Sequence, residues 1–187
     1  MESSYTDVMV DIETTGVAPD DSAIIQIAAV RFNLEERTVD STDMFNRCLS
    51  IPPKRFWDEG TRHWWSKQKA SVFQEITSRA EDPATVVQAL ADWAGYKGLT
   101  FWAKPSHFDF MFVESYFKQF NIPSPFHFRN TIDQNSFIRG LGRSSNLPKV
   151  QVEMAGDAHN AIFDVLNQIG TVFAAMDQVH PYVPEAA

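Results

Sequence analysis

Cysteine is nearly absent from the chain, since Cys48 is the only one among 187 residues. A single thiol excludes a disulfide framework within the chain and is typical of proteins in a reducing compartment. No apolar run approaches the roughly 20 residues of a membrane-spanning helix, and residues 1–6 are polar, unlike a signal peptide. We therefore expect a cytoplasmic protein without membrane contacts.

Positive charge is also scarce. The chain has 16 Lys and Arg residues against 24 Asp and Glu residues, which gives a net charge of −8. This balance excludes a broad basic face that coats long duplexes. It does not exclude nucleic acid, because a site for divalent cations concentrates carboxylates and the bound ions reverse the field that a phosphate meets.

The remaining composition is that of a folded chain, with 44% hydrophobic and 21% charged residues. A length of 187 residues suits one domain with a sizeable core. We expect a single domain over residues 1–177 and a loose C-terminal tail over residues 178–187, which contain two prolines. Aromatic residues reach 13%, and core filling explains most of them.

Hydrophobic periodicity predicts strands first and then alternating helices and strands. A turn at residues 34–37 is expected to lead into the third strand, and Ser106 to cap the fourth helix. The predicted strands cover residues 5–11, 23–32, 43–49, 100–103 and 128–130, and the predicted helices cover residues 59–67, 70–79, 83–96, 106–120, 132–139 and 157 onward. This order implies an α/β fold with a mixed β-sheet flanked by α-helices.

Two acids, Asp11 and Glu13, stand two positions apart at the end of the first predicted strand. Their side chains should point to the same face of the sheet. Two like charges on one face are costly unless a cation neutralises them, and hard oxygen ligands suit Mg²⁺ or Mn²⁺. Taken alone, the pair is a weak signal, because about one Asp-x-Glu is expected by chance in such a chain, and a solvated pair at a strand end is the commoner explanation.

Asp109 lies on the apolar face of a predicted helix, with Phe112, Val113 and Tyr116 three, four and seven positions further on. Burial of an unpaired carboxylate costs several kcal/mol or raises its pKa. Asp109 therefore requires a partner. A cation shared with the other acids is one candidate, and a buried ion pair with Lys104 or Arg129 is the alternative.

His159 and Asp164 are five positions apart, which is about 140° around a helix, so they do not form the one-face pair of a zinc helix. Asp164 can complete a carboxylate cluster with Asp11, Glu13 and Asp109. His159 can reach the substrate side of that cluster. A structural or simply exposed histidine near the start of a helix is the alternative.

Together these residues resemble the three exonuclease motifs of the DEDD superfamily, in its histidine subgroup (DEDDh). The matching stretches are Asp11-x-Glu13, Phe108-Asp109-Phe110 and His159-x-Ala161-x-x-Asp164. The order of elements extends the likeness over about residues 5–176. Segments 62–68 and 101–105 are similar to small phage and bacterial exonucleases related to phage exonuclease A and to the Rv-type exoribonucleases. Similarity to oligoribonuclease is confined mainly to the motifs.

The resemblance implies a ribonuclease H-like fold in which four acids hold two Mg²⁺ or Mn²⁺ ions. Asp11 would bridge both ions, Glu13 and Asp164 would hold the ion on the nucleophile side, and Asp109 would act largely through water on the other. Two such ions can clamp an in-line displacement at phosphorus. His159 would be the general base, a role that suits an ordinary pKa of about 6.5.

The implied reaction releases nucleoside 5′-monophosphates from single-stranded DNA or RNA with a free 3′ end, in a bacterial or phage-infected cell. No motif specifies a contact to the 2′-OH, so the sequence leaves the choice between DNA and RNA open. Two alternatives remain. One is a catalytically silent nucleic-acid-binding module, which the replacement of any one acid would favour, and none is replaced. The other is an oligoribonuclease-like trimmer of short RNA, for which a homodimer is expected.

Several residues are candidate substrate contacts. Backbone N–H groups after the acidic pair can meet the terminal nucleotide, and aromatic rings can stack on a base. These candidates are Thr14, Thr15, Gly16, Phe108, Phe110 and Trp65. Each is equally compatible with a turn or core role. The adjacent Trp64 and Trp65 point about 100° apart on a helix, so at most one is expected in the core. Candidate guides for the nucleic-acid backbone are Lys54, Arg55, Arg62, Arg139, Arg143 and Lys149.

Overall fold

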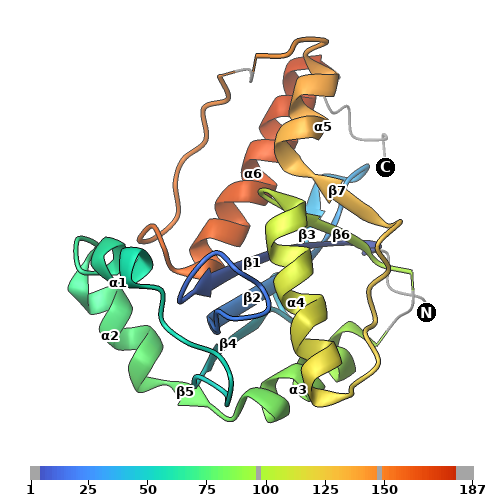
Figure 1. The fold of residues 1–187 in the computed structure, drawn as a ribbon. Helices are drawn as coiled ribbons and strands as arrows, with labels where there is room; N and C mark the ends of the chain where they lie inside the picture. The colour runs from blue at the N-terminus through green and yellow to red at the C-terminus, as the bar shows by residue number, and fades with distance from the viewer. Residues whose placement is uncertain (1–4, 96–97, 147–148, 180–187) are drawn as a thin grey trace.

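A computed structural model describes residues 5–95, 98–146 and 149–179. One seven-stranded sheet lies between groups of helices (Figure 1). Its strands are β1 (Asp7–Thr14), β2 (Ile24–Asn33), β3 (Thr38–Val39), β4 (Phe45–Leu49), β5 (Ala80–Glu81), β6 (Thr100–Ala103) and β7 (Thr131–Asp133). The helices are α1 (Glu59–Trp65), α2 (Ala70–Ser78), α3 (Pro83–Ala94), α4 (Ser106–Phe120), α5 (Gln134–Leu141) and α6 (Ala161–Val179).

The sheet is mixed, as the sequence predicts. Its order is β5-β4-β2-β1-β6-β7, and β3 also pairs with β2. The central strand β1 runs antiparallel to β2 and parallel to β6. The α/β class and the flanking helices are therefore confirmed, and among the described residues no helix is both long and apolar enough to cross a membrane.

Alternation along β1 assigns its side chains to two different cores. Val8, Val10 and Ile12 belong to the core that α3 and α4 cover. Met9 belongs to the core that α6 covers, together with Val165 of that helix. Because side chains two positions apart share a face, Asp11 and Glu13 lie on the same face, as the sequence predicts, and that face is the α6 side.

A buried arginine fixes the segment that follows β1. Arg55 is only 5% exposed, and its guanidinium donates hydrogen bonds to the backbone oxygens of Pro19 and Ser22. The same group lies 4.0 Å from the centre of the Tyr116 ring. The prediction that Arg55 guides nucleic acid is therefore wrong, because its donors are used inside the protein.

Several predicted boundaries shift in the N-terminal half and around α4. The turn after β2 leads first into the short β3, which the sequence analysis did not predict, and the third predicted strand is β4, which begins at Phe45 and not at Asp43. Ser106 does not cap α4, since Pro105 holds the cap position and the Ser106 N–H donates to Asp133 at the end of β7. The strand predicted at residues 128–130 is β7, three residues later, because Phe128 lies in an exposed turn.

The last helix begins at Ala161 and not at Asp157. The reason is His159, whose φ of 62° is left-handed and interrupts helical geometry. The helix then continues through Gln178 and Val179, two residues that were expected in the loose tail. The rest of that tail, residues 180–187, lies outside the described residues.

Tyr116→Phe should lower the free energy of unfolding by about 1–3 kcal/mol. The Ile24 N–H donates to the Tyr116 hydroxyl at 2.7 Å in the core, and the substitution leaves that buried donor without its acceptor. Urea denaturation monitored by circular dichroism measures the effect. An unchanged midpoint would show that this hydrogen bond does not hold β2 against α4.

Candidate active site

Four acids from three elements meet at the C-terminal end of β1. Asp11 and Glu13 come from β1, Asp109 from the first turn of α4, and Asp164 from the first turn of α6. Glu13 and Asp109 are buried, whereas Asp11 and Asp164 are partly exposed. The structure therefore brings together residues that are up to 153 positions apart in the chain.

Asp109 reaches the cluster because β1 extends beyond its partner strand. The pairing of β1 with β6 ends at Met9 and Trp102, which leaves the following stretch of β1 without a strand on that side. The Asp109 carboxylate occupies this place, and its Oδ1 accepts a hydrogen bond from the Ile12 N–H at 3.1 Å. The proposed ion pair of Asp109 with Lys104 or Arg129 is absent from the ion pairs among the described residues.

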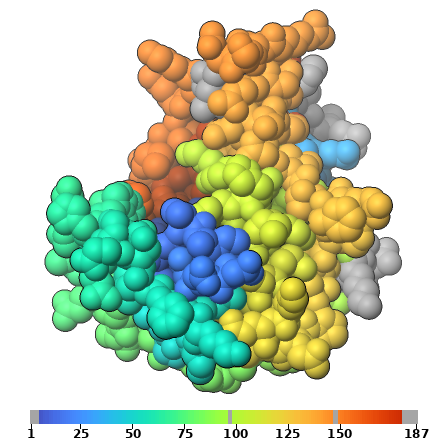
Figure 2. Space-filling view, viewed as in Figure 1, coloured from blue at the N-terminus to red at the C-terminus, as the bar shows by residue number. Residues whose placement is uncertain are grey.

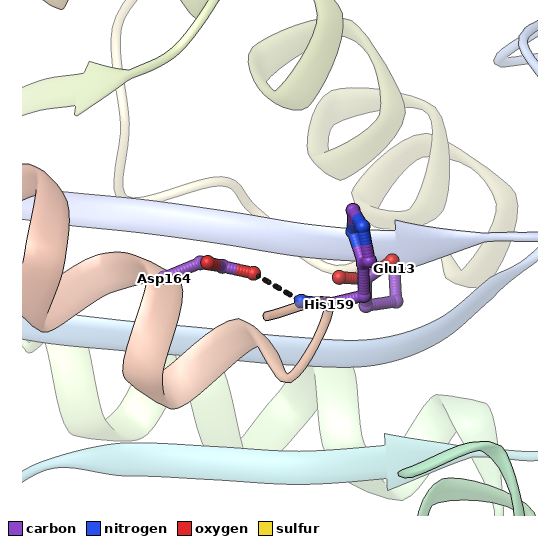
Figure 3. A group of neighbouring side chains, drawn as sticks. All are labelled: Glu13, His159 and Asp164. Atoms are coloured by element: carbon purple, nitrogen blue, oxygen red, sulfur yellow. Dashed lines mark hydrogen bonds between the residues drawn. The ribbon is translucent and has the colours of Figure 1, made fainter. Parts of the chain in front are cut away.

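His159 lies beside two of these acids (Figure 3). Its backbone N–H donates to Asp164 Oδ2 at 2.9 Å, and ligand atoms of Glu13, His159 and Asp164 lie within 4.8 Å of one another. The imidazole packs edge to face against Trp64, with ring centres 4.7 Å apart. Its strained backbone, the Asp164 carboxylate and the indole together fix the place of this imidazole.

Buried amides tie the start of α6 to the sheet, and the sequence analysis did not find them. Gln26 of β2 donates to Asn160 Oδ1 at 2.9 Å and accepts the Ala161 N–H at 3.1 Å. Gln168 of α6 donates to Asp11 Oδ1 at 2.7 Å. Two signals were available: Gln26 interrupts an apolar strand, and Gln168 lies four positions after Asp164 on the same helical face.

Burial raises the pKa values of all four acids, and repulsion by neighbouring carboxylates adds to the rise at Asp11, Glu13 and Asp109. Burial, and then the charge of Asp164, raises the pKa of Asp11 to about 7. Burial, and then the charge of Asp11, raises the pKa of Glu13 and of Asp109 well above their ordinary ranges. The pKa of Asp164 rises through burial, and the His159 N–H opposes that rise. The ionised form of the cluster is therefore disfavoured in the absence of a counter-charge, and a cation would stabilise it.

The candidate residues after the acidic pair are held by internal contacts. The Thr14 hydroxyl donates to the Gly16 oxygen at 2.7 Å, and the Thr15 hydroxyl donates to the Phe56 oxygen at 2.6 Å. A Cβ at Gly16 would lie 2.3 Å from Ser22 Oγ, so only glycine fits this turn. The following segment is exposed between the α1–α2 surface and α4, as the blue atoms of Figure 2 show.

The aromatic candidates occupy different positions. Phe110 is 8% exposed and packs edge to face on Phe101, whereas Phe108 is partly buried against Phe112. Trp65 is 5% exposed, and its indole N–H donates to the Thr14 oxygen at 3.0 Å. The neighbouring Trp64 is 40% exposed and is the tryptophan that touches His159.

One exposed cation acts on the acidic cluster. The charge of Lys104, at the end of β6, lowers the pKa values of Asp11 and Asp164, although burial outweighs it in both. Five of the predicted backbone guides lie at exposed positions: Lys54, Arg62, Arg139, Arg143 and Lys149. None of the five contributes to the pKa shifts of the four acids.

Comparison with known sequences shows one family. The model of the 3′-5′ exoribonuclease Rv2179c-like domain matches residues 6–176. Among curated proteins, no sequence matches the chain. The family match spans every motif residue from Asp11 to Asp164.

Comparison with solved structures shows the same fold in several proteins, among them two nucleases. The chain superposes on S. pombe Pop2p in its Mg²⁺- and Mn²⁺-bound form with a TM-score of 0.69, 15% identity, and coverage of 94% of this chain and 84% of that one. The superposition on cell-death related nuclease 4 has a TM-score of 0.67 and 18% identity, and it covers 92% of this chain and 64% of that one. The superposition on the zinc-bound complex of E. coli exonuclease I with single-stranded DNA has a TM-score of 0.69 and 15% identity, and it covers 93% of this chain and 40% of that one. The chain thus spans about 40% of the length of exonuclease I.

Asp11→Asn should raise the melting temperature of the metal-free protein at pH 8, and the gain should shrink as the pH falls from about 7 toward 4. A carboxyl whose pKa is raised to about 7 by folding stabilises the fold below its ordinary pKa of 3.8, and this stabilisation is lost as the pH rises through 7. The asparagine keeps an oxygen for Gln168. Thermal scans in EDTA measure the effect, and a gain that is the same at pH 5 and pH 8 would contradict it.

Proposed function

Since the chain belongs to the family of 3′-5′ exoribonuclease Rv2179c-like domains, we propose that it removes nucleotides one at a time from the 3′ end of single-stranded nucleic acid. The observation that carries the proposal is the convergence of Asp11, Glu13, Asp109 and Asp164 beside His159 at one end of β1. The family description favours RNA, and the complex of exonuclease I with single-stranded DNA supports an unpaired strand.

The proposed cofactors are two Mg²⁺ or Mn²⁺ ions held by the four acids, as in the histidine subgroup of the DEDD superfamily. The donor set supports this, because carboxylate oxygens are the ligands that these ions prefer. The raised pKa values support it too, since they reflect charge that the protein itself leaves largely uncompensated. When bound, the ions would activate the attacking water and stabilise the departing 3′ oxygen.

His159 is the proposed general base. It takes a proton from the water that attacks phosphorus, and the products are a nucleoside 5′-monophosphate and a strand shortened by one residue. The hydrogen bond from its backbone N–H to Asp164 holds the residue, and Trp64 closes one side of the imidazole. A general base so placed needs no movement of α6 to reach the cluster.

The remaining candidates have supporting roles in this proposal. Phe108 is the partly buried ring that offers a face to a base. Phe110 and Trp65 are buried, and they support the site by packing in the core beneath it. Thr14, Thr15 and Gly16 shape the turn against which the terminal nucleotide rests. We also propose that residues 1–177 act as a single domain, since the described helices pack on one sheet.

The test of the activity is the length of 5′-labelled RNA and DNA of matched sequence, followed over time with Mg²⁺, Mn²⁺ or EDTA. A ladder that shortens from the 3′ end only with metal, and is absent in Asp11→Ala, is the expected result. A comparison of the two ladders ranks the two sugars. Binding without shortening of either strand would instead favour a silent binding module.

His159→Ala should lower the rate of hydrolysis by about 10²-fold or more, because the general base is lost. Metal affinity should change little, since the four carboxylates remain. Single-turnover kinetics and Mn²⁺ titration by calorimetry measure the two effects. A large fall in Mn²⁺ affinity would instead show that His159 is a metal ligand. Its partners would be Glu13 and Asp164, whose ligand atoms lie within 4.8 Å of those of His159.

A further inference from the structure

A cavity of about 280 Å³ lies between α5, α6 and residues 150–154, and one motif residue, Asp164, is part of its lining. Figure 1 shows the segment that joins α5 to α6 passing beside α6 on its way to the start of that helix. The polar residues of the lining are Lys104, Gln134, Asn135, Asp164, Asn167, Gln168 and Thr171. Its volume is near the lower limit of small-molecule sites.

Two amide oxygens in this lining are buried without a donor. Gln134 is 2% exposed and Gln168 is 7% exposed, and their Oε1 atoms have no hydrogen-bond partner in the part of the chain that the structure describes. The orientation of Gln168 follows from its neighbour, because its Nε2 donates to the Asp11 carboxylate. Its Oε1 is therefore held as an acceptor.

Unpaired buried acceptors are uncommon in folded proteins, and each is costly. Both glutamines line the same cavity, and an occupant that donates hydrogen bonds would satisfy their amide oxygens. The Asp164 carboxylate in the same wall adds a third acceptor with negative charge. The occupant should therefore present N–H groups, and an amino group in particular.

The other walls restrict the occupant further. Ile138, Val152 and Met154 supply an apolar side, which suits a flat ring better than a fully hydrated cation. Lys104 is exposed and lines the same cavity, so its ammonium can meet a phosphate. A ring with an amino group, joined to a phosphate, is the chemistry of a nucleotide.

We propose that this cavity binds a nucleobase that carries an amino group, with Gln134 and Gln168 as its acceptors and Lys104 toward its phosphate. The choice of a nucleobase among donor ligands rests on the proposed function. Gln134 is then a specificity-determining residue outside the carboxylate cluster. Adenine, cytosine and guanine carry the required amino group, and uracil lacks it.

Isothermal titration calorimetry with the four ribonucleoside 5′-monophosphates in EDTA tests the proposal without hydrolysis. The wild type should bind AMP, CMP and GMP about 5-fold or more tightly than UMP. Gln134→Met, which keeps the length of the side chain but not its acceptor, should abolish this difference. The matched control Gln88→Met, on an exposed position of α3, should retain it.

Thermal unfolding separates ligand recognition from a structural role. Without ligand, Gln134→Met should unfold at the same temperature as the wild type or higher, because it removes an unpaired buried acceptor. A lower melting temperature would assign Gln134 to the architecture and overturn the proposal. Equal binding of all four nucleotides, or no binding of any, would overturn it as well.

A second arm identifies the source of the base. RNAs that differ only in the base on the 5′ side of the first scissile bond are compared in Mg²⁺. A preference for amino-bearing bases that disappears in Gln134→Met places a residue of the substrate strand in the cavity. Equal rates alongside selective nucleotide binding identify the occupant as a free nucleotide. A failure of hydrolysis would concern the proposed activity alone, since the binding arm contains no metal.

Discussion

Repulsion among four carboxylates at the end of β1 is the constraint on which the site depends. Asp11, Glu13, Asp109 and Asp164 are brought together from three elements, and burial strengthens every interaction among them. The charge of Lys104 offsets only part of this. Such an arrangement lowers the stability of the empty site and makes the binding of divalent cations favourable, so that stability and function oppose each other at this position.

The rest of the fold holds these acids in place. The sheet contributes the strand β1, which outruns β6 and so leaves the Ile12 N–H for Asp109. Gln26 fixes the first residues of α6, and with them His159 and Asp164. These contacts are made by backbone groups and neutral amides, which orient a carboxylate without neutralising it. A buried arginine at the same place would compete with the proposed metal ions.

The sequence predicted the sheet, its flanking helices and the convergence of the acids, because hydrophobic periodicity and the motif order are local signals. It did not predict that α6 starts at Ala161, since nothing in the local sequence signals the left-handed backbone of His159 or its packing against the distant Trp64. The wrong prediction for Arg55 has a similar cause. Its charge suggested a surface role, but its hydrogen-bond partners lie up to 64 positions away in the chain. Tertiary partners of this kind leave little trace in local sequence.

The number and position of Mn²⁺ ions in crystals of the protein test the account most directly. An anomalous difference map from crystals grown with Mn²⁺ and a 3′-terminal nucleotide should show two peaks, both in contact with Asp11, with Glu13 and Asp164 at one and Asp109 near the other. No peak at the end of β1, or a single peak held by Glu13, His159 and Asp164 without Asp11, would contradict the claim that the four acids form a two-ion site.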